Sequence, residues 1–490
     1  MIRHQLPAII IVAPFIMAIL TNLMGLWSRS ACYYAALFTA GVSLFSSIGI
    51  LDTVISTGKI SYRLGGWEPP WGIEYLVDHL NAYMLVIVTL IAFLSILYSY
   101  RFAEKDMPAR IPQFYSLMLL LLTGLIGMTI TGDAFNLYVL IEITSIACYA
   151  LIAKGDDKSP LASFNYLIIG TAGACLYLIG VGYLYILTGS LNMADLTNLL
   201  PKVYHTKALL AAFFFFIVGI AIKMAFFPLH GWLPNAYNHS PDSVSAFMAG
   251  TVTKVCAYVL IRVMFTIFQP QYSLSIVPIL PLLGWLSVGA MLYGCILALA
   301  QRELKNIFSY LIIAEVGYIV VGISTATKIG FTGSVLHILN DAIMMACLFF
   351  TAGAIAYKTG ARTIDDVKGI HKKMPLTTAG FTVGAVSVVG VPPTCGFFSK
   401  WYLLLGTIHS GEYHYTAGLL LSSLLCAIVL YRVLQSMYSQ NNEISTKNDE
   451  APATMLFPIY VTVFAILIIG FMSGNIISTV IDKTIPIGFR

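Results

Sequence analysis

The strongest constraint on this sequence is a series of apolar runs, each near the ~20 residues that a helix needs to cross a ~30 Å hydrocarbon layer. Only 10% of the 490 residues are charged, against about 25% in soluble proteins. A membrane β-barrel would instead show alternating segments of about 10 residues. We therefore predict an all-α polytopic membrane protein with about fourteen transmembrane helices. The runs lie near residues 7–27, 31–55, 79–100, 112–131, 134–153, 160–188, 207–228, 241–268, 275–300, 303–325, 330–357, 377–405, 414–438 and 454–478.

Two segments need a separate interpretation. The first 20 residues resemble a signal peptide, but no convincing cleavage site follows, so we expect them to form the first membrane helix. The segment 191–204 is too polar to span the bilayer and is expected to lie along its surface.

The remaining composition argues against several other classes of site. All eight cysteines lie in apolar stretches and none forms a Cys-x-x-Cys pair, so we expect packing residues and no metal site. No basic cluster alternates with aromatic residues, which argues against a nucleic-acid partner. No haem or nucleotide motif is present, so no cofactor is expected.

The distribution of lysine and arginine predicts the orientation of the chain. With an even number of spans both termini lie on one side, which carries nine basic residues, Arg262 among them. The opposite side carries fifteen, among them Lys305. Because the more basic side faces the cytoplasm, both termini are predicted on the outer face of a cell membrane.

The three other basic residues, Lys223, Lys254 and Lys400, lie inside predicted spans. Each buried charge costs at least about 2.5–3.5 kcal/mol, so these lysines require partners or water. Acids and a histidine occupy similar positions, and His337 precedes Asp341 by one helical turn on the same face. The simplest explanation of these charges is that they form structural ion pairs or reach the membrane surface with their side chains. A set spread over six helices better fits proton transfer, because burial and a neighbouring acid act in opposite directions on a lysine's proton affinity. The buried acids are Glu142, Glu315 and Asp341.

Prolines are expected to break two of the lysine-bearing helices. Pro228 follows Lys223 by five residues, and Pro392 and Pro393 precede Lys400. Proline removes a backbone donor, and loosened backbone at membrane depth is tolerated only beside protein or water. Interrupted helices with nearby ionisable residues are typical of transport sites, whereas single prolines are often simple kinks. His230 and His239 bracket the first break, as proton-entry groups or as solvated loop residues.

Three stretches resemble the antiporter-like proton-conducting membrane subunits of respiratory complex I, of Mrp-type Na+/H+ antiporters and of membrane-bound hydrogenases. The resemblance covers residues 100–435, and the Lys254 region, the stretch GFFSKWYLL and the length are most similar to the D-subunit branch of the Mrp antiporters. The stretches are KMAFFPLHGWLPNAYNHSPDSVSAFMAGTVTKVCAYVLIR, LALAQRELKNIFSYLIIAEVGYIVVG and MPLTTAGFTVGAVSVVGVPPTCGFFSKWYLLLG.

This resemblance implies fourteen helices with two inverted five-helix repeats. The implied division is 1–111 for helices 1–3, 112–268 and 269–438 for the two repeats, and 439–490 for the last loop and helix. It also implies a proton path in which Glu142 pairs with Lys223, and Lys254, His337 and Lys400 carry the proton onward.

Three positions depart from the family pattern. Glu315 stands where many members have histidine or glutamine, and Asp341 and Met345 alter a pattern that often contains lysine. These changes make the second half more anionic. We expect that this half either binds a cation or transfers protons at different proton affinities.

The sequence therefore predicts the proton-translocating subunit of a multisubunit Na+/H+ antiporter, with other membrane subunits as partners and protons, with Na+ as a candidate second ion, as cargo. One alternative is the equivalent subunit of a redox complex such as a hydrogenase, formate hydrogenlyase or NADH:quinone oxidoreductase. A solitary carrier for a small solute is a third, but its charges would cluster at one midplane site. No redox or hydrolytic site is expected in this chain.

Overall fold

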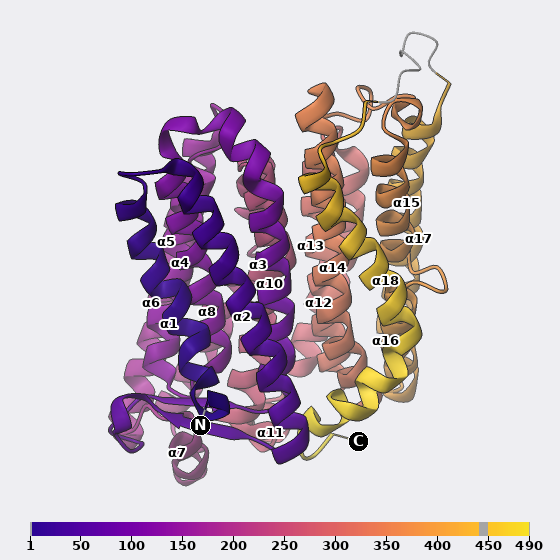
Figure 1. Ribbon diagram of the computed structural model, residues 1–490. Helices are drawn as coiled ribbons and strands as arrows, with labels where there is room; N and C mark the ends of the chain where they lie inside the picture. The colour runs from indigo at the N-terminus through magenta and orange to yellow at the C-terminus, as the bar shows by residue number, and fades with distance from the viewer. Residues whose placement is uncertain (1, 441–448, 490) are drawn as a thin grey trace.

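The computed structural model describes residues 2–440 and 449–489, which form α-helices and one β-hairpin. The long helices run side by side, and α1 begins and α18 ends at the same, lower end of Figure 1. The first half contains α1 (Ile2–Met24), α2 (Arg29–Thr57), α3 (His79–Asp106), α4 (Ile111–Ile130), α5 (Ala134–Ile152), α6 (Ser159–Thr188), α7 (Met193–Leu199), α8 (Lys207–Lys223), α9 (Leu233–His239) and α10 (Asp242–Arg262). The second half contains α11 (Gln269–Gln271), α12 (Leu280–Ala300), α13 (Leu304–Ser324), α14 (Lys328–Thr359), α15 (Pro375–Val389), α16 (Cys395–His409), α17 (Tyr413–Tyr438) and α18 (Ala453–Thr479).

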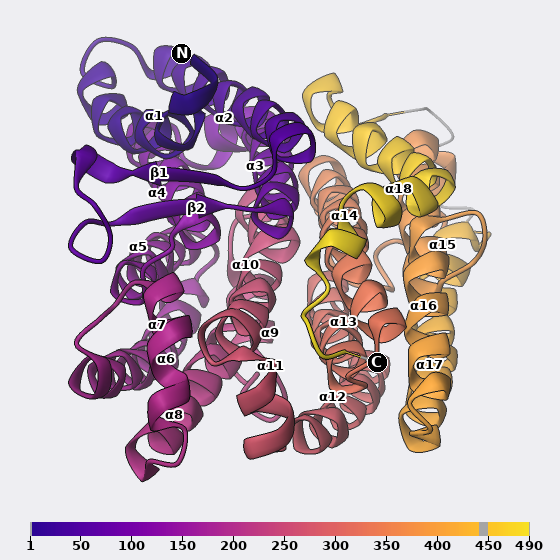
Figure 2. The same cartoon turned by 90° about the horizontal axis from the view of Figure 1, so that it is seen from below.

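The hairpin lies against the lower ends of α1, α3 and α4, as the view from below shows (Figure 2). Strands β1 (Ile60–Arg63) and β2 (Glu74–Val77) pair antiparallel, with Ile60 opposite Val77. The segment after α6 contains only the seven-residue helix α7 and a following turn of 3₁₀-helix, as its polarity predicts.

Polar caps define several helix ends. The Asp78 carboxylate accepts hydrogen bonds from the first turn of α3, and Thr206 caps α8 in the same way. Gly189 and Gly360 follow the last residues of α6 and α14 in the left-handed conformation. These caps satisfy terminal backbone groups that the helices leave without partners.

Within the described residues, twelve helices are long and apolar enough to cross a membrane. The predicted all-α membrane architecture is therefore confirmed. A count of fourteen requires two further spans, and the broken segments α8–α9 and α15–α16 are the candidates for them. That count, the inverted repeats and the division into domains stay predictions.

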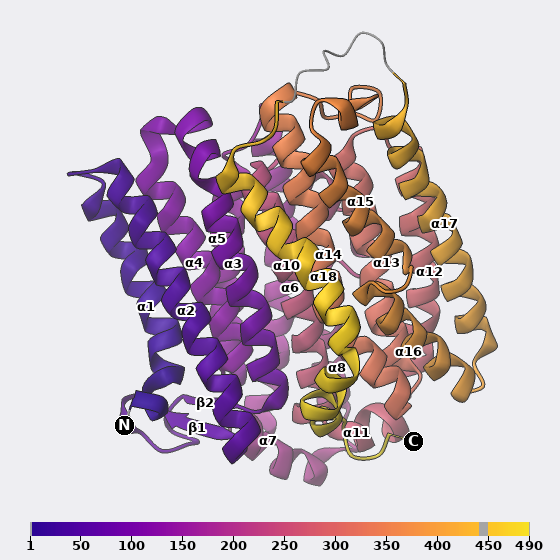
Figure 3. The ribbon, with the colours of Figure 1, turned by 45° about the vertical axis from the view of Figure 1, so that its right-hand side comes forward.

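The core lies at the junction of the two halves. Helices α10, α13 and α14 are almost wholly buried, whereas α1, α2, α6, α17 and α18 expose large apolar side chains such as Phe38, Phe45 and Phe471. Gly250 lets α10 approach α14, because a Cβ atom there would lie 3.1 Å from the Ala342 carbonyl oxygen. Helix α18 crosses the surface diagonally and packs on α3, α14, α15 and α16, which joins the halves (Figure 3).

Candidate functional site

The first helix break places Lys223 at the end of α8. The helix stops at Lys223, Pro228 lies in the irregular segment that follows, and α9 begins at Leu233. The Trp232 indole N–H donates to the Ile222 carbonyl at 2.9 Å, which ties the break to the helix end. A cation at a helix C-terminus is favoured by the unpaired carbonyls and the helix dipole.

Lys223 contacts two groups on α5. Its Nζ lies 3.5 Å from Oε1 of Glu142 and donates to the Ser145 hydroxyl at 2.7 Å. The Lys223 side chain is 5% exposed and that of Glu142 is 23% exposed. The shorter contact is therefore to a neutral group, while the acid stays close enough for an ion pair.

The second break has a similar relation to Lys400. Helix α15 ends at Val389, Pro392 and Pro393 lie in the gap, and α16 begins at Cys395. Lys400 Nζ donates to the Val388 carbonyl at 2.6 Å, one of the carbonyls near the end of α15. Gly390 follows α15 with φ of 93°, and a Cβ atom there would lie 3.2 Å from Cδ of Lys400.

Glu315 on α13 lies between two bases. Its Oε2 is 2.8 Å from Nε2 of His337, and its Oε1 is 3.9 Å from Nζ of Lys400. The other ring nitrogen of His337 is 3.0 Å from the Ser399 hydroxyl. Lys400 also lies 4.5 Å from the centre of the Tyr318 ring. All of these groups are buried, so we call Glu315, His337 and Lys400 the second-half cluster.

The central pair joins α10 to α14. Lys254 Nζ lies 2.8 Å from Oδ2 of Asp341, and both side chains are fully buried. Lys254 also donates to the Ala249 carbonyl at 2.8 Å. Because Asp341 is one helical turn from His337, the central pair adjoins the second-half cluster.

The contact between Lys223 and the central pair is less direct. A cavity of about 10 Å³ is lined by Lys223 together with Cys256 and Val259 of α10. A cavity of roughly this size is near the lower limit for one water molecule. Proton transfer between Lys223 and Lys254 therefore requires a bridging molecule or a side-chain movement.

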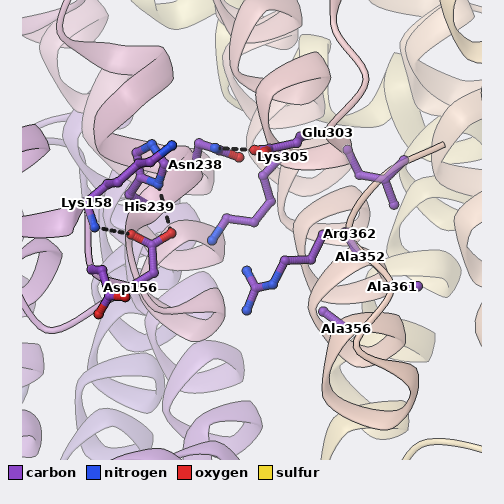
Figure 4. Close-up of a pocket in the computed structure, with 12 residues that line it drawn as sticks. Asp156, Lys158, Asn238, His239, Glu303, Lys305, Ala352, Ala356, Ala361 and Arg362 are labelled. Carbon is purple, nitrogen blue, oxygen red and sulfur yellow. Dashed lines mark hydrogen bonds and ion pairs between the residues drawn. The ribbon is translucent and has the colours of Figure 1, made fainter. Parts of the chain in front are cut away.

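The two histidines beside the first break have different surroundings. His239 Nδ1 lies 2.8 Å from Oδ2 of Asp156, at a cavity of about 270 Å³ between the upper ends of the two halves (Figure 4). His230 is buried beside Phe227 and Tyr293, with ring centres 5.6 and 4.8 Å away. The structure therefore places His239 at an accessible charged site and His230 in an aromatic one.

A fourth buried lysine was not predicted from the sequence. The distribution of basic residues places Lys305 at the membrane surface, but Lys305 is 7% exposed and its Nζ lies 3.0 Å from Oδ1 of Asp242. It also donates to the Ser240 carbonyl at 2.6 Å, and it lines the cavity beside His239. Its position in the first turn of α13, where the helix dipole disfavours a cation, was the available signal for a nearby acid.

From the sequence, Arg262 is likewise only a marker of orientation. In the structure it is partly buried at the lower end of α10 and forms an ion pair with Asp78. Burial opposes the charge of Asp78, but Arg262 and the backbone N–H groups of Asn81 and Leu80 outweigh it, so the pKa of Asp78 is lowered. In the part of the chain that the structure describes, no three or more His, Cys, Asp or Glu side chains are grouped to hold a metal ion.

The family model for the membrane region described as NADH:quinone oxidoreductase/Mrp antiporter matches residues 131–426, more than half of the chain. The chain belongs to this family. The resemblance inferred from its motifs is therefore confirmed.

The relatives of this chain include subunits named for the oxidoreductase and subunits named for the antiporter. The N subunit of the NADH-quinone oxidoreductase of Desulforudis audaxviator is 41% identical over 98% of this chain and 99% of its own. The D subunit of the Na(+)/H(+) antiporter of Bacillus subtilis is 30% identical over 94% of this chain and 93% of its own. The chain is thus a multi-pass membrane protein that matches nearly the whole length of these relatives.

A solved structure shares the whole fold. A chain of the membrane-bound sulfane sulfur reductase, an archaeal respiratory membrane complex, superposes with a TM-score of 0.91 at 28% identity. The match covers 98% of this chain and 97% of that one. The helical arrangement of this chain is therefore also found in a subunit of a respiratory membrane complex.

Proposed function

We propose that this chain is the proton-translocating subunit of a multisubunit complex in a bacterial or archaeal cell membrane. The observation that carries the proposal is the series of acid–base contacts from Glu142–Lys223, through Lys254–Asp341, to the second-half cluster, in which every group except Glu142 is buried. Buried ionisable groups in a membrane are costly and mark ion pathways. Their placement on facing helices across the whole molecule fits a proton relay better than one solute site.

The first step of the proposed mechanism is a change of partner at Lys223. While Glu142 is close, the ion pair holds the proton on Lys223, and its loss favours release toward Lys254. At an effective dielectric constant of about 20, one charge contact at about 4 Å changes the energy by about 4 kcal/mol. The neutral contact to Ser145 offers Lys223 a second position without that charge.

The following steps use groups that balance one another in charge. Lys254 and Lys400 compensate Asp341 and Glu315, and the imidazole of His337 is the group of this set that takes up and passes on the transferred proton. His337 reaches both Glu315 and Ser399 through its two ring nitrogens. A proton can therefore enter at one nitrogen and leave from the other, and Lys400, as the exit group, takes it up after releasing the proton that it already carries. Asp341 and Glu315 would adapt this half to a cation or to a different proton affinity.

The test is proton movement by the purified parent complex in proteoliposomes. Lys223→Ala and Glu142→Ala are each expected to abolish driven proton flux while the complex still assembles. Lys207→Ala, at the exposed start of the same helix, is the matched control and should transport normally. Normal flux in both relay variants would overturn the mechanism.

Two parent complexes have support. A Mrp-type cation/proton antiporter agrees with the relative named as the D subunit of a Na(+)/H(+) antiporter, with Na+ as the second ion. A redox complex is favoured by the 41% identity to a relative named as a subunit of NADH-quinone oxidoreductase and by the respiratory complex with the shared fold. Gentle solubilisation and mass spectrometry of the companion chains distinguish them, because iron–sulfur, nickel or flavin subunits occur only in the second.

The proposal also includes the orientation. The excess of basic residues at the upper end of Figure 1 supports an outer location for α1's start and α18's end. Labelling of Lys59→Cys and Arg362→Cys with a membrane-impermeant thiol reagent on intact cells tests it, with the unmodified protein as the background control. Labelling at position 59 alone is expected, and labelling at position 362 alone would reverse the orientation.

A further inference from the structure

Helix α10 has a cavity at each end, and both cavities are lined by acidic and basic side chains. The upper cavity is lined by Asp156, His239 and Lys305, and Asp242 forms an ion pair with Lys305 at the start of α10. Each of these groups can take up and release a proton. The lower cavity, about 210 Å³ in volume, adjoins β2, and its charged lining residues are Asp78 and Arg262.

Arg262 is held at the lower cavity by a set of polar contacts. Its guanidinium group donates to the Asp78 carboxylate and to the Asn81 side-chain oxygen. Its Nε donates to the Tyr258 hydroxyl at 3.0 Å. The Tyr258 hydroxyl in turn donates to the Thr129 carbonyl at 2.8 Å and accepts from the Asn81 amide at 2.9 Å. The charge of Arg262 is therefore fixed in position by α3, α4 and α10.

The same face of α10 leads from this cavity to the central pair. Lys254, Tyr258 and Arg262 follow one another at intervals of four residues, so they lie on one face about 6 Å apart along the axis. Tyr258 stands between the arginine and the relay lysine. A cation or proton that moved from the lower cavity toward Lys254 along this face would first meet Arg262.

We propose that Arg262 is an electrostatic barrier that prevents protons and other cations from passing between the lower cavity and Lys254. This inference rests on the proposed proton relay. Guanidinium keeps its proton under all physiological conditions, so it repels cations and cannot pass a proton on. Fixed arginines exclude cations from other membrane pores by the same electrostatic effect. Asn81 and Tyr258 hold the guanidinium in place, and Asp78 faces it without removing its charge.

The experiment measures passive proton leak in proteoliposomes that contain the parent complex, with trapped pH dye, an imposed pH gradient and no driving ion. Arg262→Gln is expected to raise the leak roughly tenfold, equivalent to about 1.4 kcal/mol of barrier. Asp78→Asn is the matched control, because it breaks the same ion pair and retains the guanidinium charge. Its leak should equal that of the unmodified protein. Equal leaks from both variants would indicate lost packing and overturn the proposal.

Two further variants protect the test against misfolding and a false leak. The exchange Asp78→Arg with Arg262→Asp keeps an ion pair but places a titratable carboxylate on α10, so the leak should again rise. Adding Lys254→Met to Arg262→Gln should return the leak to its original rate, because the leak passes through Lys254. The barrier proposal would be overturned if Arg262→Gln or the exchange variant leaked protons no faster than the unmodified protein. If instead the unmodified complex showed no driven proton flux, or none that Lys223→Ala abolished, the proposed function would be overturned.

Discussion

The two helix breaks hold their lysines in different environments. In the first half, Lys223 has one acid, Glu142, at 3.5 Å and a neutral hydroxyl at 2.7 Å, and Glu142 is 23% exposed. In the second half, Lys400 is 3.9 Å from Glu315, which also contacts His337 at 2.8 Å, and all three are buried. One acid serves one base in the first half and two bases in the second.

This difference assigns different tasks to similar breaks. A loose pair with an alternative neutral partner can separate at small cost, which suits a group that starts a transfer. A shared acid within a buried network couples two bases, so a proton on one affects the other through a low-dielectric medium. We therefore expect the first half to act as a switch and the second half as a strongly coupled unit.

The largest effect should follow Glu315→Gln. Removal of the shared acid leaves Lys400 and His337 without their charge partner, and breaking a buried ion pair costs about 3–5 kcal/mol. Driven proton flux should fall roughly a hundredfold or more, and the complex should unfold at a clearly lower temperature.

The comparison variant is Glu142→Gln, which should also stop transport but lower the unfolding temperature much less. Glu104→Gln, at an exposed carboxylate paired with Arg101, should change neither property. Equal thermal destabilisation by the two relay variants would contradict the difference between the halves.

Asp341→Asn should have the next largest effect. It removes the charge partner of Lys254 while keeping the side-chain size, so transport should fall roughly tenfold. The dependence on pH and on Na+ concentration should also change, which flux measured across a matrix of both conditions would detect. Asp341→Glu retains the charge and should recover much of the activity. An unchanged pH and Na+ dependence in Asp341→Asn would show that this acid has no role in ion transfer.

Ser145→Ala should have a moderate effect that is confined to the switch. Lys223 loses its neutral partner, and since one hydrogen bond contributes about 1 kcal/mol, transport should slow roughly fivefold. Initial rates of dye-detected proton uptake are the measurement. Ser163→Ala, which removes a hydroxyl that donates to the Tyr149 carbonyl at 2.7 Å, should leave the rate unchanged. The same rate in both variants would exclude Ser145 from the switch.

The smallest effect is expected for Asp78→Asn, which should reduce stability by about 1 kcal/mol or less at neutral pH. Asparagine still caps α3, so the lost contribution is the ion pair with Arg262. The pKa of Asp78 is lower in the folded protein, so its contribution is present above the ordinary value of 3.8 and disappears as the pH falls below it. Thermal unfolding of both proteins from pH 7 to pH 3 should therefore show a constant difference that narrows only below about pH 4. A difference that instead grows toward acid pH would contradict this assignment.

Much of the candidate site could be predicted because burial of charge is visible in a sequence. Lys223, Lys254 and Lys400 interrupt apolar runs, and Pro228, Pro392 and Pro393 mark the segments where the structure has its breaks. Pairings were harder to predict. Lys254 meets Asp341 and Glu315 meets His337 only because α10, α13 and α14 pack together in the core.

The sequence by itself determined that this protein lies in a lipid bilayer, that it is helical and which family it belongs to. The length of the apolar runs and the motifs depend on local residues alone. Only the tertiary structure decided which charges neutralise one another, and it shows Lys305, which was expected at the surface, in a buried ion pair with Asp242. It also placed Lys305 beside Asp242 at one end of α10 and Arg262 beside Asp78 at the other. The physical reason is that a buried charge is stabilised by whichever partner the folded helices bring within a few ångströms, and sequence separation does not specify that distance.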